Sequence, residues 1–216
     1  PSVFFDEETQ PPQKEEDPCK LRLPALPCLP AMPHSELEKS LDNKMIRIRK
    51  PFLMNLIGHP VSMLPLPMTM MSAHPTGNMD HIVFRFQGDE CAMSWKEAGA
   101  PNRILCGMDG EPRNATIRLA GMRLTANSTA AWQDEQTLDV RMRPLEHVCT
   151  RRLRFEFKDS RVKMTPRAEP SMQAIGESLA YGATYFIKNP IIAKIGEFAL
   201  KHLYLVAEPT HRGRIL

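Results

Sequence analysis

The chain has 216 residues and a mass of 24.5 kDa, which is enough for one large domain or two small ones. Hydrophobic residues make up 42% and charged residues 25% of the sequence, a balance that fits a globular protein and excludes wholesale disorder. Lys and Arg total 28 against 25 Asp and Glu, and the formal charge of +3 is too small to indicate a polyanion partner by itself.

Targeting and cysteine signals favour the cytoplasm. The sequence has no uncharged apolar run of about 18 residues, so we predict no transmembrane segment. The first residues, PSVFFDEETQ, lack the basic start and apolar core of a signal peptide, and the missing initiator Met suggests a fragment or a processed chain. Cys91 and Cys106 could pair across a hairpin, but five scattered cysteines without a C-x-x-C spacing favour a reducing compartment.

Proline dominates the first part of the chain. Thirteen of the 20 prolines lie in residues 1–75, and residues 24–33 read PALPCLPAMP. Proline fixes φ and removes a backbone donor, so this segment cannot be a regular helix or a central strand. We predict an extended Pro-rich arm over residues 1–44, acidic at 6–17, with a polyproline ligand as the alternative.

Residues 45–170 are predicted to form an antiparallel β-domain. Apolar and polar residues alternate in about seven short segments, and turn residues separate these segments at near-regular spacing. Met45–Arg49 alternates too, and the methionines of 45–79 are interpreted as core filler. The pattern predicts a mainly β fold, an antiparallel meander that forms a lipocalin-like barrel or a sandwich. The later segments are 82–86, 91–95, 103–106, 115–120, 130–132, 137–143, 153–157 and 162–164.

The period changes to that of a helix over residues 171–208. Ile192, Ile195 and Ala199 share one helical face, and Asn189-Pro190 supplies an N-cap and a first-turn proline. A pair of helices packed on the β-domain is the simpler interpretation. The alternative is an amphipathic helix at a membrane surface, although its polar face is mixed in sign. Residues 209–216 are predicted to be a basic tail.

Residues 58–165 carry a series of motifs in the order and spacing of a known domain. The pieces are Gly58–Val61, Asn78, FRFQGD at 84–89, GMDGEPR at 107–113, AWQDEQTL at 131–138 and LRFEFKDSRV at 153–162. In this series the segment resembles the C-terminal β-domain of β-lactamase-related, penicillin-binding-protein-like serine hydrolases. It departs from the family in its opening strand, which lacks the aromatic residue, and in the turn at 158–160, which lacks Gly-Asp.

The resemblance implies an accessory domain that supports a catalytic serine-hydrolase module, in cis or in trans, and shapes its cleft. Catalysis in that family begins with S-x-x-K on a helix. The only literal match, Ser160–Lys163, falls in a predicted hairpin, where the two side chains point to opposite faces. We therefore expect no catalytic residue in this chain and leave open whether the parent protein is an enzyme. No metal and no cofactor are predicted, because neither clustered histidines nor a phosphate-binding loop is present.

Two binding functions are the alternatives. A lipocalin-like barrel could hold an apolar small ligand in its interior. A basic face could hold an anion, since nine residues of 141–167 are Arg or Lys against three acids. No nucleic-acid partner is predicted, because aromatic side chains do not interleave the basic ones, and a solvated face with the acidic arm as counter-charge is the simpler interpretation. The candidate interior residues are Phe84, Phe86, Met93, Trp95, Leu138 and Phe155. The candidate anion-binding residues are Arg151, Arg152 and Arg154.

Overall fold

The structure, a computed structural model, describes residues 32, 34–49, 62–65, 69, 74, 77, 79, 81–187, 189–202 and 208–216. The helices in this part of the chain are α1 (Leu37–Leu41), α4 (Met172–Phe186) and α5 (Pro190–Lys201). The strands are β1 (Met45–Arg49), β2 (His81–Gln87), β3 (Glu90–Glu97), β4 (Ala100–Gly107), β5 (Arg113–Leu119), β6 (Met122–Asp134), β7 (Thr137–Pro144), β8 (Thr150–Lys158), β9 (Arg161–Glu169) and β10 (His211–Ile215).

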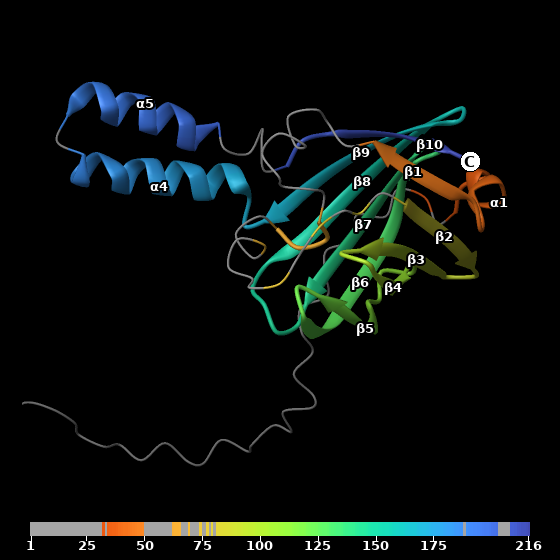
Figure 1. The fold of residues 1–216 in the computed structure, drawn as a ribbon. Helices are drawn as coiled ribbons and strands as arrows, with labels where there is room; N and C mark the ends of the chain where they lie inside the picture. The colour runs from red at the N-terminus through yellow and green to blue at the C-terminus, as the bar shows by residue number, and fades with distance from the viewer. Residues whose placement is uncertain are drawn as a thin grey trace, which may run out of the picture.

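The described strands form one strongly curved sheet (Figure 1). Its order is β4-β3-β2-β1-β10-β9-β8-β7-β6-β5, and every pair of neighbours in this order is antiparallel. The sheet curls until β4 meets β6 through a parallel bridge between Gly107 and Thr129, so its two edges lie together. The prediction of a mainly β, lipocalin-like fold is confirmed, and the curvature makes it a barrel.

Strand β10 joins the two halves of the sheet. Residues 211–215, which the sequence predicts as part of a basic tail, form β10 between β1 and β9, with Ile46 opposite Ile215 and Val162 opposite Gly213. His211 and Gly213 are buried, whereas Arg212 and Arg214, which alternate with them, are exposed. This alternation is five residues long and has His and Gly on its inner side, so hydrophobic periodicity could not reveal it.

Packed side chains fill the barrel interior. Along β8 the buried Leu153, Phe155 and Phe157 alternate with half-buried polar residues, as expected for a strand with one face on a core. The ring of Phe84 meets that of Phe155 edge to face, with 5.1 Å between centroids. The ring centroids of Trp132 and Phe157 are 6.0 Å apart. The interior is therefore a continuous aromatic and aliphatic core.

A short segment around α1 covers one end of the barrel. Glu38 accepts a hydrogen bond from Nε1 of Trp132 at 2.7 Å, and Asp42 accepts one from the backbone of Phe86 at 2.9 Å. Leu41 is buried in the core. This part of the predicted arm is thus a docked helix, whereas the acidic segment 6–17 lies outside the described residues.

Helices α4 and α5 form a hairpin between β9 and β10 that projects from the barrel (Figure 1). The Asn189 side chain accepts hydrogen bonds from the backbone of Ile191 at 2.9 Å and Ile192 at 3.3 Å, with Pro190 in the first turn. The start of the second helix is therefore as the sequence predicts.

Candidate functional site

Lys and Arg side chains line up across the outer face of β1, β10, β9 and β8. The strand registers place Arg47 opposite Arg214, Arg214 opposite Arg161, and Arg161 opposite Lys158. A second row joins Arg49 to Arg212 and Arg212 to Lys163. Like charges that face each other directly across strands destabilise a sheet. These cations therefore do not stabilise the fold, and a binding function would account for their arrangement. We call the face made by Arg47, Arg49, Lys158, Arg161, Lys163, Arg212 and Arg214 the basic face.

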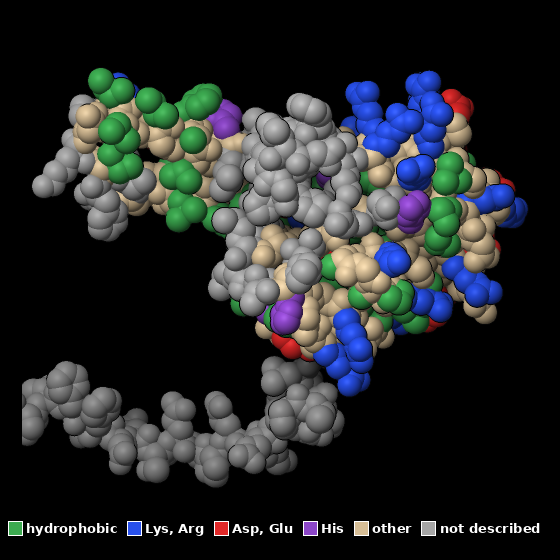
Figure 2. Space-filling model, viewed as in Figure 1, with side chains coloured by type: hydrophobic (Ala, Val, Ile, Leu, Met, Phe, Trp, Pro, Cys, Tyr) green, Lys and Arg blue, Asp and Glu red, His purple; other side chains and the backbone are tan. Residues whose placement is uncertain are grey.

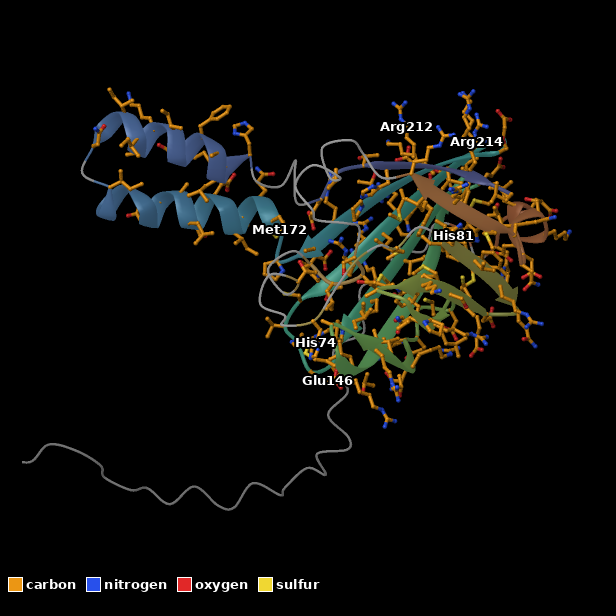
Figure 3. The ribbon with its side chains drawn as sticks, viewed as in Figure 1. His74, His81, Glu146, Met172, Arg212 and Arg214 are labelled. Carbon is orange, nitrogen blue, oxygen red and sulfur yellow. The ribbon has the colours of Figure 1, made fainter. Side chains whose placement is uncertain are left out.

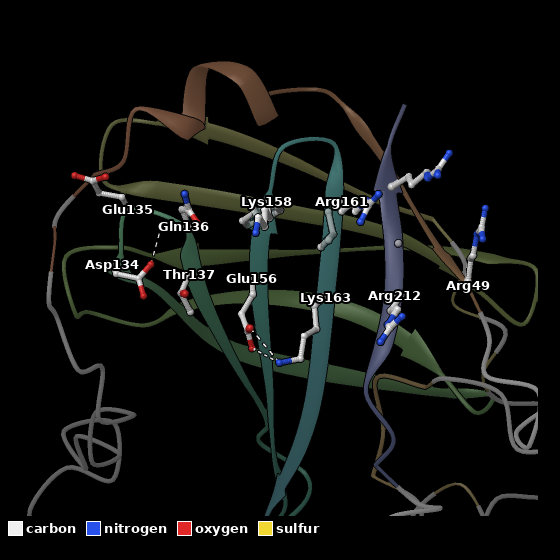
Figure 4. A pocket seen from close by; sticks show the side chains of 14 residues that line it. Arg49, Asp134, Glu135, Gln136, Thr137, Glu156, Lys158, Arg161, Lys163 and Arg212 are labelled. Atoms are coloured by element: carbon white, nitrogen blue, oxygen red, sulfur yellow. Dashed lines mark hydrogen bonds and ion pairs between the residues drawn. The ribbon is translucent and has the colours of Figure 1, made fainter.

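The basic face borders a shallow groove of about 940 Å³ (Figure 4). In Figure 2, Lys and Arg side chains gather at the upper right of the view, where Figure 1 places β1, β9 and β10. Six cations of the basic face and three carboxylates line the groove. Two of these carboxylates are engaged: Glu156 accepts from Lys163 at 2.9 Å, and Asp134 accepts from the backbone of Gln136 at 2.8 Å. Positive charge therefore dominates what the groove offers to a ligand.

Most cations of the basic face have no carboxylate partner among the described residues. Among the described residues, no acidic side chain lies within ion-pair distance of five arginines and one lysine of this face. These are Arg47, Arg49, Lys158, Arg161, Arg212 and Arg214. Exposed cations in this state bind an anion without first breaking an ion pair, and guanidinium groups can bind phosphate or carboxylate through two parallel hydrogen bonds.

The three arginines singled out from the sequence have partners of their own. Arg152 and Arg154 both donate to Asp139, Arg154 from Nε at 2.8 Å. Burial favours the neutral form of Asp139, but the guanidinium groups of Arg154 and Arg152 outweigh it and hold the pKa of that carboxyl below its usual range. Arg151 points the other way, into the barrel. None of the three is therefore an open position for an anion.

The apolar candidates lie inside the barrel. Phe84, Met93, Leu138 and Phe155 are fully buried, Trp95 is nearly so, and Phe86 is half-buried beside α1. Because no water-sized space touches the fully buried side chains, an apolar ligand at this position would have to displace them.

A buried polar cluster holds the other end of the barrel. Arg151 donates from Nη1 to Glu208 at 3.1 Å and from Nη2 to the carbonyl of Ser62 at 3.0 Å. Glu97 accepts from the backbone of Met63 and of Gly77 and from Nε1 of Trp95. The cluster fixes residues 62–64 and 77 onto the strands. Burial raises the pKa of Glu208, although Arg151 acts against that shift.

His211 lies beside this cluster and gives the fold a pH dependence. Burial, aided by the charge of Arg151, lowers the pKa of His211 from 6.5 to about 4. The unfolded chain binds a proton more readily than the folded one, so stability is lost as pH falls from 6.5 towards about 4. Between about pH 8 and about pH 5 the loss from this group is about 2 kcal/mol.

Urea unfolding at both pH values is expected to show a smaller acid loss for His211→Gln than for the unsubstituted protein. Glu208 acts in the opposite sense, because a raised carboxyl pKa favours the fold at lower pH, and comparing the two proteins removes its contribution. An equal loss in both proteins would show that His211 does not carry the effect.

Sequence reasoning missed the arginines of β1 and β10. Arg47 and Arg49 lie in the first alternating segment of the predicted β-domain, outside the basic cluster at 141–167, and Arg212 and Arg214 lie in the predicted tail. Only the closure of the barrel brings the two pairs together. The one available signal was the common pattern of the two segments, R-I-R at 47–49 and R-G-R at 212–214.

No protein-family model and no curated protein matches the sequence. Solved structures that are similar to it include the fatty-acid-binding protein from Manduca sexta, with 9% identity, a TM-score of 0.36 and coverage of 59% of this chain and 89% of that one. A fatty-acid-binding protein from Drosophila melanogaster brain has 14% identity, a TM-score of 0.37 and coverage of 59% and 91%. Lipid binding protein 8 of Caenorhabditis elegans has 8% identity, a TM-score of 0.38 and coverage of 65% and 91%.

The predicted resemblance to β-lactamase-related serine hydrolases is wrong. The solved structures just named are fatty-acid-binding and lipid-binding proteins. Several of the motifs that suggested the hydrolase domain span turns between neighbouring strands: 107–113 joins β4 to β5, and 158–160 joins β8 to β9. Gly, Asp and Ser recur at such turns in any antiparallel meander. The accessory-domain function and the catalytic module as a partner are wrong with it.

No helix in the described part of the chain is long and apolar enough to cross a bilayer. No three His, Cys, Asp or Glu side chains gather there as ligands for a metal ion.

Proposed function

We propose that this barrel is a binding protein whose basic face holds a ligand with several negative charges. The observation that carries the proposal is the row Arg47–Arg214–Arg161–Lys158, in which four cations oppose one another across four strands without a described carboxylate partner. Their mutual repulsion is relieved when an anion with several charged groups spans them. The groove beside them has room for such a ligand.

Isothermal titration with inositol hexakisphosphate tests this function. We expect binding that weakens as salt is added, because the contacts are between exposed charges. The double variant Arg161→Ser/Arg214→Ser should bind about tenfold more weakly or worse, since it removes two neighbouring cations of one row. Arg123→Ser, which removes an exposed arginine of β6 outside the groove, is the matched control. Equal affinities of the double variant and this control would contradict the proposal.

A second candidate function is the binding of an apolar ligand in the interior. The observation that favours it is the number of methionines there, because their flexible side chains can rearrange around a guest. The buried methionines are Met63, Met79, Met93, Met142 and Met164. Nile red should gain fluorescence with the protein, and Met93→Leu/Met142→Leu should reduce that gain if the methionines make room. Fluorescence equal to that of the dye in buffer would contradict this function.

The proposal includes a place in the cytoplasm. Cys91 and Cys106 face each other in the register of β3 and β4, yet both thiols are free and buried. Burial raises the pKa of both thiols and keeps them unreactive. Free thiols at facing positions are what a reducing compartment favours, since it keeps cysteines from forming disulfides.

A further inference from the structure

Helix α5 carries an apolar stripe that nothing in the described structure covers. Ile191, Ile195 and Phe198 are 65–69% exposed, and Ile192 beside them is 57% exposed. Positions 191, 195 and 198 lie on one helical face. Of the ten large hydrophobic side chains exposed in the described residues, six belong to the α4–α5 hairpin. A concentration of this kind marks an interaction surface.

The stripe faces away from α4. On the other side of the helix, Ala193, Gly196 and Leu200 are half-buried, and a side chain at Gly196 would lie 3.8 Å from Ile187, the residue that follows α4. They therefore form the side of α5 that packs against the first helix of the hairpin. The opposite side, where the stripe lies, has no packing role within the hairpin.

The apolar stripe of α5 and the basic face are exposed on the same side of the molecule. In Figure 1, α5 lies above α4, so a stripe turned away from α4 faces the upper edge of the view. Figure 3 shows Arg212 and Arg214 pointing outward at that same edge. A flat surface laid along this edge would meet both the apolar side chains of α5 and the cations of β10.

We propose that this side of the protein docks on an anionic lipid bilayer, with the stripe of α5 among the lipids and the basic face on their head groups. The inference rests on the proposed anion binding of the basic face and names its source as a membrane surface. At the surface of an anionic bilayer, negative head groups lie next to apolar acyl chains. The basic face can therefore contact the head groups while the stripe contacts the acyl chains.

The charges beside the stripe fit lipid head groups. Lys194 and Lys201 lie along one edge of the stripe, where long cationic side chains can reach phosphates while their methylenes stay in apolar surroundings. The acid on this polar face, Glu197, is paired with Lys201 at 2.6 Å. With a rise of 1.5 Å per residue, the 12 residues of α5 span about 18 Å, too short to cross a bilayer but sufficient to lie in its interface.

Vesicle flotation with the full chain tests the docking. We expect binding to vesicles of phosphatidylcholine mixed with phosphatidylserine and little binding to phosphatidylcholine alone. Ile195→Glu/Phe198→Glu should reduce binding to the anionic vesicles by about tenfold or more, because it places two carboxylates in the stripe. Ser178→Glu, an exposed position of α4, is the matched control and should bind as the unsubstituted protein does.

A second measurement separates the two proposals. The stripe variant should bind inositol hexakisphosphate with unchanged affinity, whereas Arg212→Ser/Arg214→Ser should weaken the binding of both that probe and the anionic vesicles. If the unsubstituted protein binds the hexakisphosphate but no vesicle, the docking is overturned and the proposed function stands. If it binds neither, the proposed function fails.

Three other results would overturn the docking. The first is equal binding to neutral and anionic vesicles, which would leave the basic face without a role. The second is vesicle binding by the stripe variant as strong as that of the Ser178→Glu control. The third is a dimer in sedimentation velocity that the stripe variant dissociates, because a second copy would then cover the stripe.

Discussion

Replacing Arg151 by Met is expected to lower the free energy of unfolding by about 3–5 kcal/mol. Arg151 is 3% exposed and its guanidinium pairs with Glu208, which is equally buried. Methionine fills much of the volume but leaves the Glu208 carboxylate without its cation, and an unpaired buried charge costs several kcal/mol. The carbonyl of Ser62 loses its donor as well, so the segment at 62–64 loses one of its attachments.

Urea unfolding followed by circular dichroism measures this loss. Arg103→Met, at an exposed position of β4, is the control and should change stability by less than about 0.5 kcal/mol. Arg151→Met/Glu208→Leu should recover most of the loss, because removing both partners leaves no uncompensated charge. A single variant as stable as the control would show that the pair does not hold this end of the barrel.

Arg151 also shows what the alternation of residues along a strand can predict and what it cannot. Arg151, Arg152 and Arg154 are close in sequence and form one basic cluster there, but strand alternation sends Arg151 to the inner face together with Leu153 and Phe155. That much follows from the sequence. Its partner Glu208 lies 57 residues away, beyond the helical hairpin, and no local pattern connects the two.

Local hairpins could be predicted from the sequence, whereas the candidate site could not. The hairpins from 81 to 169 were predictable, because each has alternating residues and a turn. The basic face was not predictable, because four of its seven members come from the paired strands β1 and β10, Arg47 and Arg49 on β1 and Arg212 and Arg214 on β10. The pairing of β1 with β10 joins segments that lie far apart in the sequence, and hydrophobic periodicity does not encode such a contact.

Trp132→Ala is expected to destabilise the protein by about 3–5 kcal/mol, the range for removing a buried aromatic side chain. Trp132 is fully buried, and its ring lies 6.2 Å from Phe86 and 6.0 Å from Phe157. The sequence left open whether this residue was core or an exposed anchor for another module, and the structure places it in the core. Truncation removes ring contacts to two strands and leaves a cavity beside α1. Urea unfolding measures the effect, and a change below about 1 kcal/mol would contradict the core position.

A second substitution separates the packing of this ring from its hydrogen bond. Trp132→Phe keeps an aromatic ring but cannot donate to Glu38, which accepts from Nε1 at 2.7 Å. We expect a loss of about 1–3 kcal/mol, clearly smaller than that of the Ala variant, since a donor to a charged acceptor is lost while most apolar contacts remain. Glu38→Ala removes the same bond from the other side. If that bond is what docks α1, the double variant Trp132→Phe/Glu38→Ala should cost less than the sum of the two single losses, because each single change already breaks it. Additive losses would mean that α1 is held by Leu41 and Asp42 instead.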